Sequence, residues 1–274
     1  EEIERVKDSA AVNTHQFKFS RDLQAILKNA PLLRFLLAYA LLQIAIGISN
    51  SVALFLIDIG LGLPNTFLSL FFIQYVVATL AAPLVVKLAN KLGKHIVLGL
   101  AILLLLCINV IGFMLPMGAY LLMYIIIAFV GVGFSCLYVL PTSMLADCVD
   151  YDTASSGEER VGIHMAALNL VMKLGLALGV GIAYGFLNWV NFDPAATTHT
   201  AQDVINIRIA GYGITSVVLI PAAILLWRFT ITKQYQKELR RTIEQNSASA
   251  KQSNTSFVSS EDSLMPGKAP LLPD

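Results

Sequence analysis

Long apolar stretches recur along this chain and are separated by short polar segments. Each has 19 to 25 residues and, with one exception, no charged side chain; the stretches are Phe35–Ile57, Phe67–Val86, Ile96–Leu115, Tyr120–Leu140, Ile163–Leu187 and Ile209–Trp227. A helix of about 20 residues, rising about 1.5 Å per residue, spans the roughly 30 Å hydrocarbon core of a bilayer. The pattern therefore predicts an all-α polytopic membrane protein with six transmembrane helices.

The composition agrees with this fold class. The chain is 56% hydrophobic and only 14% charged, with a mean hydropathy of +0.70, whereas a soluble domain carries about 25% charged residues. The net charge of +1 gives no indication of a nucleic-acid partner. Two of the three cysteines lie inside apolar stretches, which argues against a disulfide framework. Because the chain begins with Glu1 and shows no signal peptide, we expect the beginning of the protein to be missing.

Basic residues indicate how the predicted helices are oriented. Lysine and arginine concentrate before the first apolar stretch, after the last one, and between the second and third, where the link contains Lys87, Lys91 and Lys94. The turns at 58–66 and 116–119 contain none. By the positive-inside rule, both ends of the chain are expected to be cytoplasmic. The acidic loop predicted at Met144–Gly162 is then cytoplasmic as well, because acidic residues count little in this rule.

Three regions follow from this pattern. Residues 1–31 are predicted to be a cytoplasmic linker with a short amphipathic surface helix at Ser20–Asn29. Residues 32–231 are predicted to form the six-helix transmembrane bundle. Residues 232–274 are predicted to be a largely disordered cytoplasmic tail, because their later part is rich in Ser, Asn, Gln and Pro. We expect an integral, multi-pass protein of a bacterial inner or plasma membrane.

Lys173 is the exception among the apolar stretches. It is their only charged residue, and it lies near the middle of the fifth. A charge at the bilayer centre costs roughly 2.5–3.5 kcal/mol on insertion scales, so a partner charge, a watery cavity or a substrate must offset it. Asn169, four residues earlier, shares its helical face. One interpretation is a substrate or coupling site at the midplane, and the other is a structural lysine paired with a buried acid elsewhere, since the stretches themselves contain no acid.

Other polar positions inside the stretches are weaker candidates. Gln43 and Asn50 fall on one face of the first predicted helix, and this face either lines a cavity or forms hydrogen bonds between helices. Tyr138, in the fourth stretch, either contacts a substrate or packs against a neighbouring helix. Small residues recur at four-residue spacing in the fifth stretch, a pattern that favours close helix packing; they are Gly175 with Gly179 and Gly181 with Gly185.

A charged string follows the fourth stretch. Asp147 and Asp150 lie on one side of a helical turn, and Arg160 returns after a short loop, where it would form a bidentate pair with them. These three residues are predicted to form a cytoplasmic gate; the alternative is a solvated loop, in which such pairs contribute about 0–1 kcal/mol. There is no zinc-protease, nucleophile-elbow or P-loop motif, and the four histidines are scattered. We therefore expect neither a metal site nor an enzyme.

A series of residues between 141 and 175 has a recognisable order: Pro141, Met144, Ala146, Asp147, Asp150, Tyr151, Gly157, Arg160, Gly162, Lys173 and Gly175. This series resembles the signature of the glycoside–pentoside–hexuronide:cation symporter family, which includes the melibiose carrier and belongs to the major facilitator superfamily. Segments 28–31 and 88–94 extend the resemblance over nearly the whole chain. Two positions depart from the family pattern, because Glu159 stands where a base is common and Val161 where a glutamate is common.

The resemblance implies a fold of twelve helices in two six-helix bundles, of which this chain would be the C-terminal bundle. Its partners would be the N-terminal bundle of the same polypeptide, the lipid bilayer and a small-molecule substrate. In this family the cation-binding acids lie in the N-terminal bundle. The coupling cation, Na⁺ or H⁺, would therefore bind outside this chain, and no other cofactor is implied.

The implied function is cation-coupled symport of a sugar or glycoside by alternating access. The residues predicted to contact substrate are Lys173, Asn169, Tyr138, Gln43 and Asn50. Tyr138 occupies a position at which an aromatic ring can stack on a sugar. Two alternatives stay open: a major-facilitator transporter of an anionic or lipid-like solute, and a membrane scaffold that transports nothing.

Overall fold

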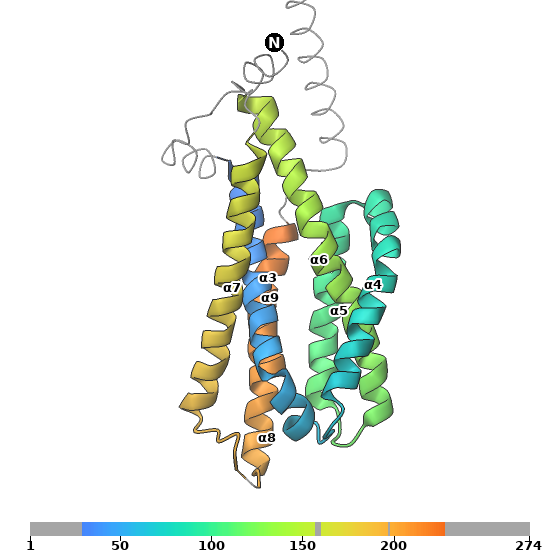
Figure 1. Cartoon of the computed structure of the whole chain (residues 1–274), viewed down its shortest axis with the longest axis vertical. Helices are drawn as coiled ribbons and strands as arrows, with labels where there is room; N and C mark the ends of the chain where they lie inside the picture. Colours follow the sequence, from blue (N-terminus) through green and yellow to red (C-terminus); the bar gives the residue numbers. More distant parts are fainter. Residues whose placement is uncertain (1–28, 157–159, 197, 228–274) are drawn as a thin grey trace, which may run out of the picture.

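The computed structural model describes residues 29–156, 160–196 and 198–227, which are helical over most of their length (Figure 1). The helices are α3 (Ala30–Phe55), α4 (Phe67–Leu92), α5 (Lys94–Met114), α6 (Tyr120–Ser156), α7 (Val161–Trp189), α8 (Ala201–Arg208) and α9 (Thr215–Trp227). Two π-helical turns continue them: η1 (Leu56–Gly60) follows α3, and η2 (Ile209–Ile214) joins α8 to α9. The predicted tail, and the predicted surface helix apart from Asn29, lie outside the described residues.

Six helical segments in the described part of the chain are long and apolar enough to cross a membrane. They are Ala30–Gly60, Phe67–Leu92, Lys94–Met114, Tyr120–Thr153, Val161–Trp189 and Ala201–Trp227. Each coincides with one of the apolar stretches in the sequence. The prediction of an all-helical chain with six helices of membrane-spanning length is therefore confirmed.

Helix α6 is longer than the sequence pattern indicated. It continues to Ser156 and so includes most of the loop predicted at Met144–Gly162, and the loop prediction is wrong for this part. The reason is that Met144, Leu145 and Cys148 remain buried at helical spacing and pack into the same core as residues deeper in the bundle. The acidic residues of this segment therefore have defined positions on a helix.

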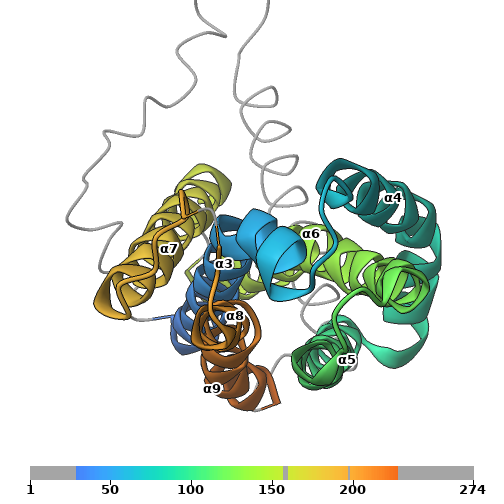
Figure 2. The same cartoon turned by 90° about the horizontal axis from the view of Figure 1, so that it is seen from below.

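The bundle has two central helices, α3 and α6 (Figure 2). Helix α7 packs along α3 and α4 packs along α6, so α7 and α4 lie at opposite edges, while α5 and α9 complete the bundle. Large buried side chains fill the space between α3, α5 and α6; they include Leu32, Phe35, Leu42, Leu98, Ile102, Leu140 and Met144. The edge helices are the least enclosed of the six, because only 22% of an 18-residue apolar part of each is buried. Both therefore have faces available for lipid or for another bundle.

Glycines allow α7 to approach α3 closely. A Cβ atom on Gly175 would lie 2.7 Å from Cβ of Gln43, and one on Gly47 would lie 2.6 Å from the carbonyl oxygen of Leu176. Gly181 and Gly185 have no such neighbour within 4 Å in the described residues. The first of the two predicted small-residue patterns is therefore a packing surface, whereas the second faces away from α3.

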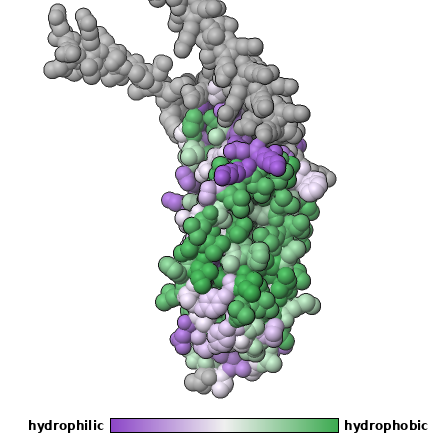
Figure 3. Space-filling view, turned by 90° about the vertical axis from the view of Figure 1, so that its right-hand side faces the viewer, coloured by the Kyte–Doolittle hydropathy of each residue, from purple (hydrophilic) through white to green (hydrophobic). Residues whose placement is uncertain are grey.

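The outer face that includes α4 is suited to lipid. Figure 3 shows hydrophobic residues over the middle of this face and hydrophilic residues gathered near its upper part. Helix α4 exposes large apolar side chains along much of its length, among them Leu68, Phe72, Leu80 and Leu84. Contiguous apolar surface of this kind is unusual on a soluble monomer and typical of a membrane or protein interface.

Candidate functional site

Ionisable side chains gather at the end of the bundle where α3, α5 and α7 begin and α6 ends. We call this the charged end and define it by Lys94, Asp147, Asp152, Arg160 and His164. Backbone geometry helps to position it, because α5 starts directly after Gly93, whose φ of 108° is difficult for residues with a side chain. Lys94 is therefore held at the first position of α5, facing the extension of α6.

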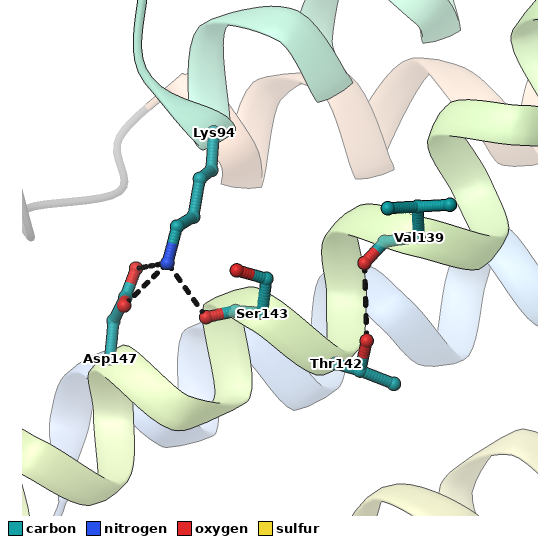
Figure 4. Close-up of polar contacts among 5 residues, drawn as sticks. All are labelled: Lys94, Val139, Thr142, Ser143 and Asp147. Atoms are coloured by element: carbon teal, nitrogen blue, oxygen red, sulfur yellow. Dashed lines mark hydrogen bonds and ion pairs between the residues drawn. The ribbon is translucent and has the colours of Figure 1, made fainter. Parts of the chain in front are cut away.

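Lys94 and Asp147 form an ion pair between α5 and α6 (Figure 4). The Nζ atom of Lys94 donates to both carboxylate oxygens of Asp147, at 2.6 and 2.8 Å, and to the carbonyl oxygen of Ser143 at 3.0 Å. Asp147 is only 5% exposed. Charge-assisted hydrogen bonds of this length are strong, and a buried carboxylate depends on such a partner. The pair therefore ties the start of α5 to α6.

The sequence pattern predicts Asp147 as a site residue but does not indicate Lys94 as its partner. The available signal was a lysine at the start of the third apolar stretch and an aspartate just beyond the fourth. Consecutive antiparallel helices place such positions at the same end of a bundle. Which of the basic residues in that link reaches the acid depends on how α5 is rotated against α6, and this is a property of the packing.

A second cluster joins α6 to the start of α7. Nη1 of Arg160 and Nε2 of His164 each lie 3.8 Å from the same oxygen of Asp152, Oδ2. The Nδ1 atom of His164 lies 2.8 Å from the backbone oxygen of Arg160. Arg160 therefore lies beside the acidic segment of α6, where one of its contacts is with Asp152. Asp150 is half-buried on the same segment.

Lys173 and Asn169 are both exposed on α7. They lie on a face turned away from α3, because Gly175 and Gly179 occupy the side that contacts it. Among residues 29–156, 160–196 and 198–227, none forms a hydrogen bond or ion pair with Lys173. The lysine is thus available to a partner outside this bundle.

Gln43 and Tyr138 occupy different surroundings. Gln43 is buried on α3 and its side-chain amide donates a 2.7 Å hydrogen bond to the hydroxyl of Tyr39. Tyr138, on α6, is 54% exposed. Its ring centroid lies 6.0 Å from that of Phe134 on the same helix. The ring of Tyr138 is therefore accessible, whereas the side chain of Gln43 is enclosed within the bundle.

Asn50 is exposed and lines a partly open cavity between α3, α4, α5, α6 and the η2–α9 segment. The cavity has a volume of about 100 Å³. Its lining is mostly apolar but includes Ser49, Asn50, Gln74, Asn109 and Thr215. Gln43 and Asn50 therefore have different neighbours along α3, because Gln43 lies at the α7 contact and Asn50 at this cavity.

The part of the chain that the structure describes contains no group of three or more His, Cys, Asp or Glu residues able to hold a metal ion. The site residues described above make ion pairs and hydrogen bonds, such as those of Lys94 with Asp147 and of Gln43 with Tyr39.

Comparisons with known proteins agree with this description. The family described as MFS/sugar transport protein matches residues 1–233. An uncharacterized symporter of Synechocystis sp. is 32% identical over 133 residues, which are 46% of this chain and 24% of that protein. The inner membrane symporter YicJ of Escherichia coli is 28% identical over 162 residues, 58% of this chain and 34% of that protein. The matches thus span between a quarter and about a third of the relatives' own length.

Proposed function

The chain belongs to the MFS/sugar transport protein family, and we propose that it forms one half of a cation-coupled symporter for a sugar or glycoside. It is a multi-pass membrane protein of a transporter family and not an enzyme. In the proposed protein, a second six-helix bundle of the same polypeptide faces this one. Substrate binds between the bundles near the midplane, and Na⁺ or H⁺ drives transport by alternating access.

One observation supports this proposal most strongly: Lys173 is exposed at mid-height on an apolar edge helix and is turned away from its own bundle. A cation at this depth requires a counter-charge or a polar ligand. A facing bundle with intramembrane acids, or a hydroxylated substrate, supplies one. Asn169 extends the same polar stripe, and Tyr138 provides an accessible ring for stacking.

The charged end serves as the cytoplasmic gate in this proposal. Its predicted members are Asp147, Asp150 and Arg160. We add Lys94, which pairs with Asp147, and Asp152, which lies 3.8 Å from Arg160. Because the basic link between α4 and α5 lies at this end, we assign both ends of the chain to the cytoplasmic side. Ion pairs there hold one conformation and must open when the transporter faces inward.

Lys173 also supports a second candidate function, the transport of an anionic solute, since no carboxylate in the described residues neutralises it. The ammonium group would then bind the substrate's charge directly. Competition separates the two: neutral glycosides compete for uptake in the first case, and carboxylates or phosphates in the second.

The test is uptake by proteoliposomes that contain the natural polypeptide of which this chain is part. Labelled glycosides are supplied under an inward Na⁺ gradient, an inward proton gradient, or neither. Accumulation above the equilibrium level that depends on one gradient, and that disappears in Lys173→Gln, is the expected result. Gradient-dependent uptake of anions alone would transfer the proposal to the second candidate. Absence of any flux across both substrate classes would favour a membrane scaffold.

A further inference from the structure

The imidazole of His164 is buried at the charged end and has a different neighbour at each ring nitrogen. The residue is 1% exposed and lies in the first turn of α7. Its Nδ1 atom is 2.8 Å from the backbone oxygen of Arg160. A carbonyl oxygen only accepts hydrogen bonds, so Nδ1 must carry the hydrogen. This contact fixes the tautomer of the ring.

The other nitrogen, Nε2, is left with its lone pair when the ring is neutral. It is buried and forms no hydrogen bond within the described residues, and it lies 3.8 Å from Oδ2 of Asp152. A lone pair and a carboxylate oxygen are both acceptors, so they cannot bond to each other. One added proton changes the contact completely, because an imidazolium N–H facing a carboxylate makes a charge-assisted hydrogen bond.

We propose that His164 and Asp152 form a proton-binding site that fastens the end of α6 to the start of α7. A proton from the adjoining aqueous phase adds to the lone pair of Nε2, and no other covalent bond changes. The resulting cation faces Asp152, and the two helices draw together at this end. Histidine suits the role because its charge changes between pH 5 and 8. The proposal concerns the α6–α7 junction and is independent of what the protein transports.

Other ionisable groups surround this pair. Arg160 lies 3.8 Å from the same oxygen of Asp152 and so competes with the imidazolium for it. On α6, Asp147 is neutralised by Lys94, while Asp150 and Tyr151 lie on the same segment. On α3, which packs along α7, Arg34 is exposed. A proton on His164 thus gives Asp152 a further cationic partner, one that is buried and comes from α7 itself.

Cys148 provides a natural reporter for this junction. It lies one helical turn before Asp152 on α6, so the two share a side of the helix, and it is 0% exposed. Loosening of α6 from α7 opens that side to reagents. Cys107 and Cys136, and any further cysteine in the natural polypeptide, are replaced by Ser or Ala so that only Cys148 can react. The readout is its rate of alkylation by N-ethylmaleimide in membranes at pH 6 and pH 8.

Two substitutions of His164 define the extremes. His164→Leu has no group that bonds to Asp152, whereas His164→Gln places a permanent N–H donor near the position of Nε2. Comparing each variant with the unsubstituted protein at the same pH cancels the pH dependence of the thiol itself. At pH 6 the unsubstituted protein is expected to react about tenfold more slowly than His164→Leu, and at pH 8 at a similar rate. His164→Gln is expected to react slowly at both.

A further variant and a control complete the test. Asp152→Asn gives a neutral amide that donates to the Nε2 lone pair, so Cys148 in this variant is expected to react slowly at both pH values. If His164→Leu does not fold, the loss of the pH response in Asp152→Asn provides the test. His95→Gln, at a histidine in the first turn of α5, is expected to keep the full pH response. The proposal is overturned if the rate ratio between the unsubstituted protein and His164→Leu is the same at both pH values, or if His164→Gln responds to pH as the unsubstituted protein does.

Discussion

Gly47 on α3 and Gly179 on α7 face each other with no side chain between their backbones. A Cβ atom on Gly47 would lie 3.1 Å from the Cα of Gly179, and one on Gly179 would lie 2.8 Å from the Cα of Gly47. This contact sets the distance between a central helix and the edge helix that presents Lys173. The position of the lysine relative to the rest of the bundle therefore depends on two residues without side chains.

Gly179→Ala is expected to lower the stability of the bundle by about 1–3 kcal/mol, because the new methyl group meets backbone atoms that cannot move aside independently. The measurement is the thermal unfolding midpoint of the detergent-solubilised protein. Gly181→Ala, two residues later on the open side of the same helix, is the matched control and should leave the midpoint unchanged or slightly higher. Equal effects of the two substitutions would contradict the packing assignment.

Lys94→Met is expected to lower stability by about 3 kcal/mol, because it leaves the buried carboxylate of Asp147 without its cation. Lys91→Met, at an exposed position on α4, should change the same unfolding midpoint little. The double variant Lys94→Met with Asp147→Leu removes both charges and should recover much of the loss. A double variant no more stable than Lys94→Met alone would argue against a pairwise interaction.

Lys173→Gln is expected to reduce substrate uptake at least tenfold while changing stability by less than about 0.5 kcal/mol, because Lys173 is exposed in this bundle. Uptake and the unfolding midpoint are measured on the same preparation. Lys173→Arg, which keeps the charge, should retain part of the uptake, and Leu174→Ala, at the exposed neighbouring position, should retain nearly all of it. A large loss of stability in Lys173→Gln would indicate a structural lysine.

Arg208→Met is expected to loosen the end of the bundle opposite the charged end. Its guanidinium donates to the carbonyl oxygens of Gly60 at 2.8 Å and Phe113 at 2.9 Å, which joins the α8 segment to η1 and to the end of α5. Hydrogen exchange in the 60–66 turn should accelerate by about tenfold or more, since each bond to a charged donor contributes about 1.5–3 kcal/mol. Exchange near Lys94 provides the internal reference and should not change.

Several single residues of the candidate site could be selected from the sequence, but their contact partners on other helices could not. Asp147 and Arg160 were selected because charges at a helix end after an apolar stretch are conspicuous, and Lys173 because it is the only charge in six such stretches. His164 was passed over as a scattered histidine. Its neighbour Asp152 belongs to another helix, and nothing local in the sequence of α7 marks its Nε2 atom as buried beside a carboxylate.

The sequence by itself determined that the chain forms six helices of membrane-spanning length, because hydrophobic length is a local property that each stretch expresses alone. Only the tertiary structure decided that Lys94 is the partner of Asp147, which lies 53 residues away, and that Gly179 is packed while Gly181 is open. These outcomes depend on how each helix is rotated against its neighbours. That rotation is set by the fit of side chains on separate helices, and no single segment contains it.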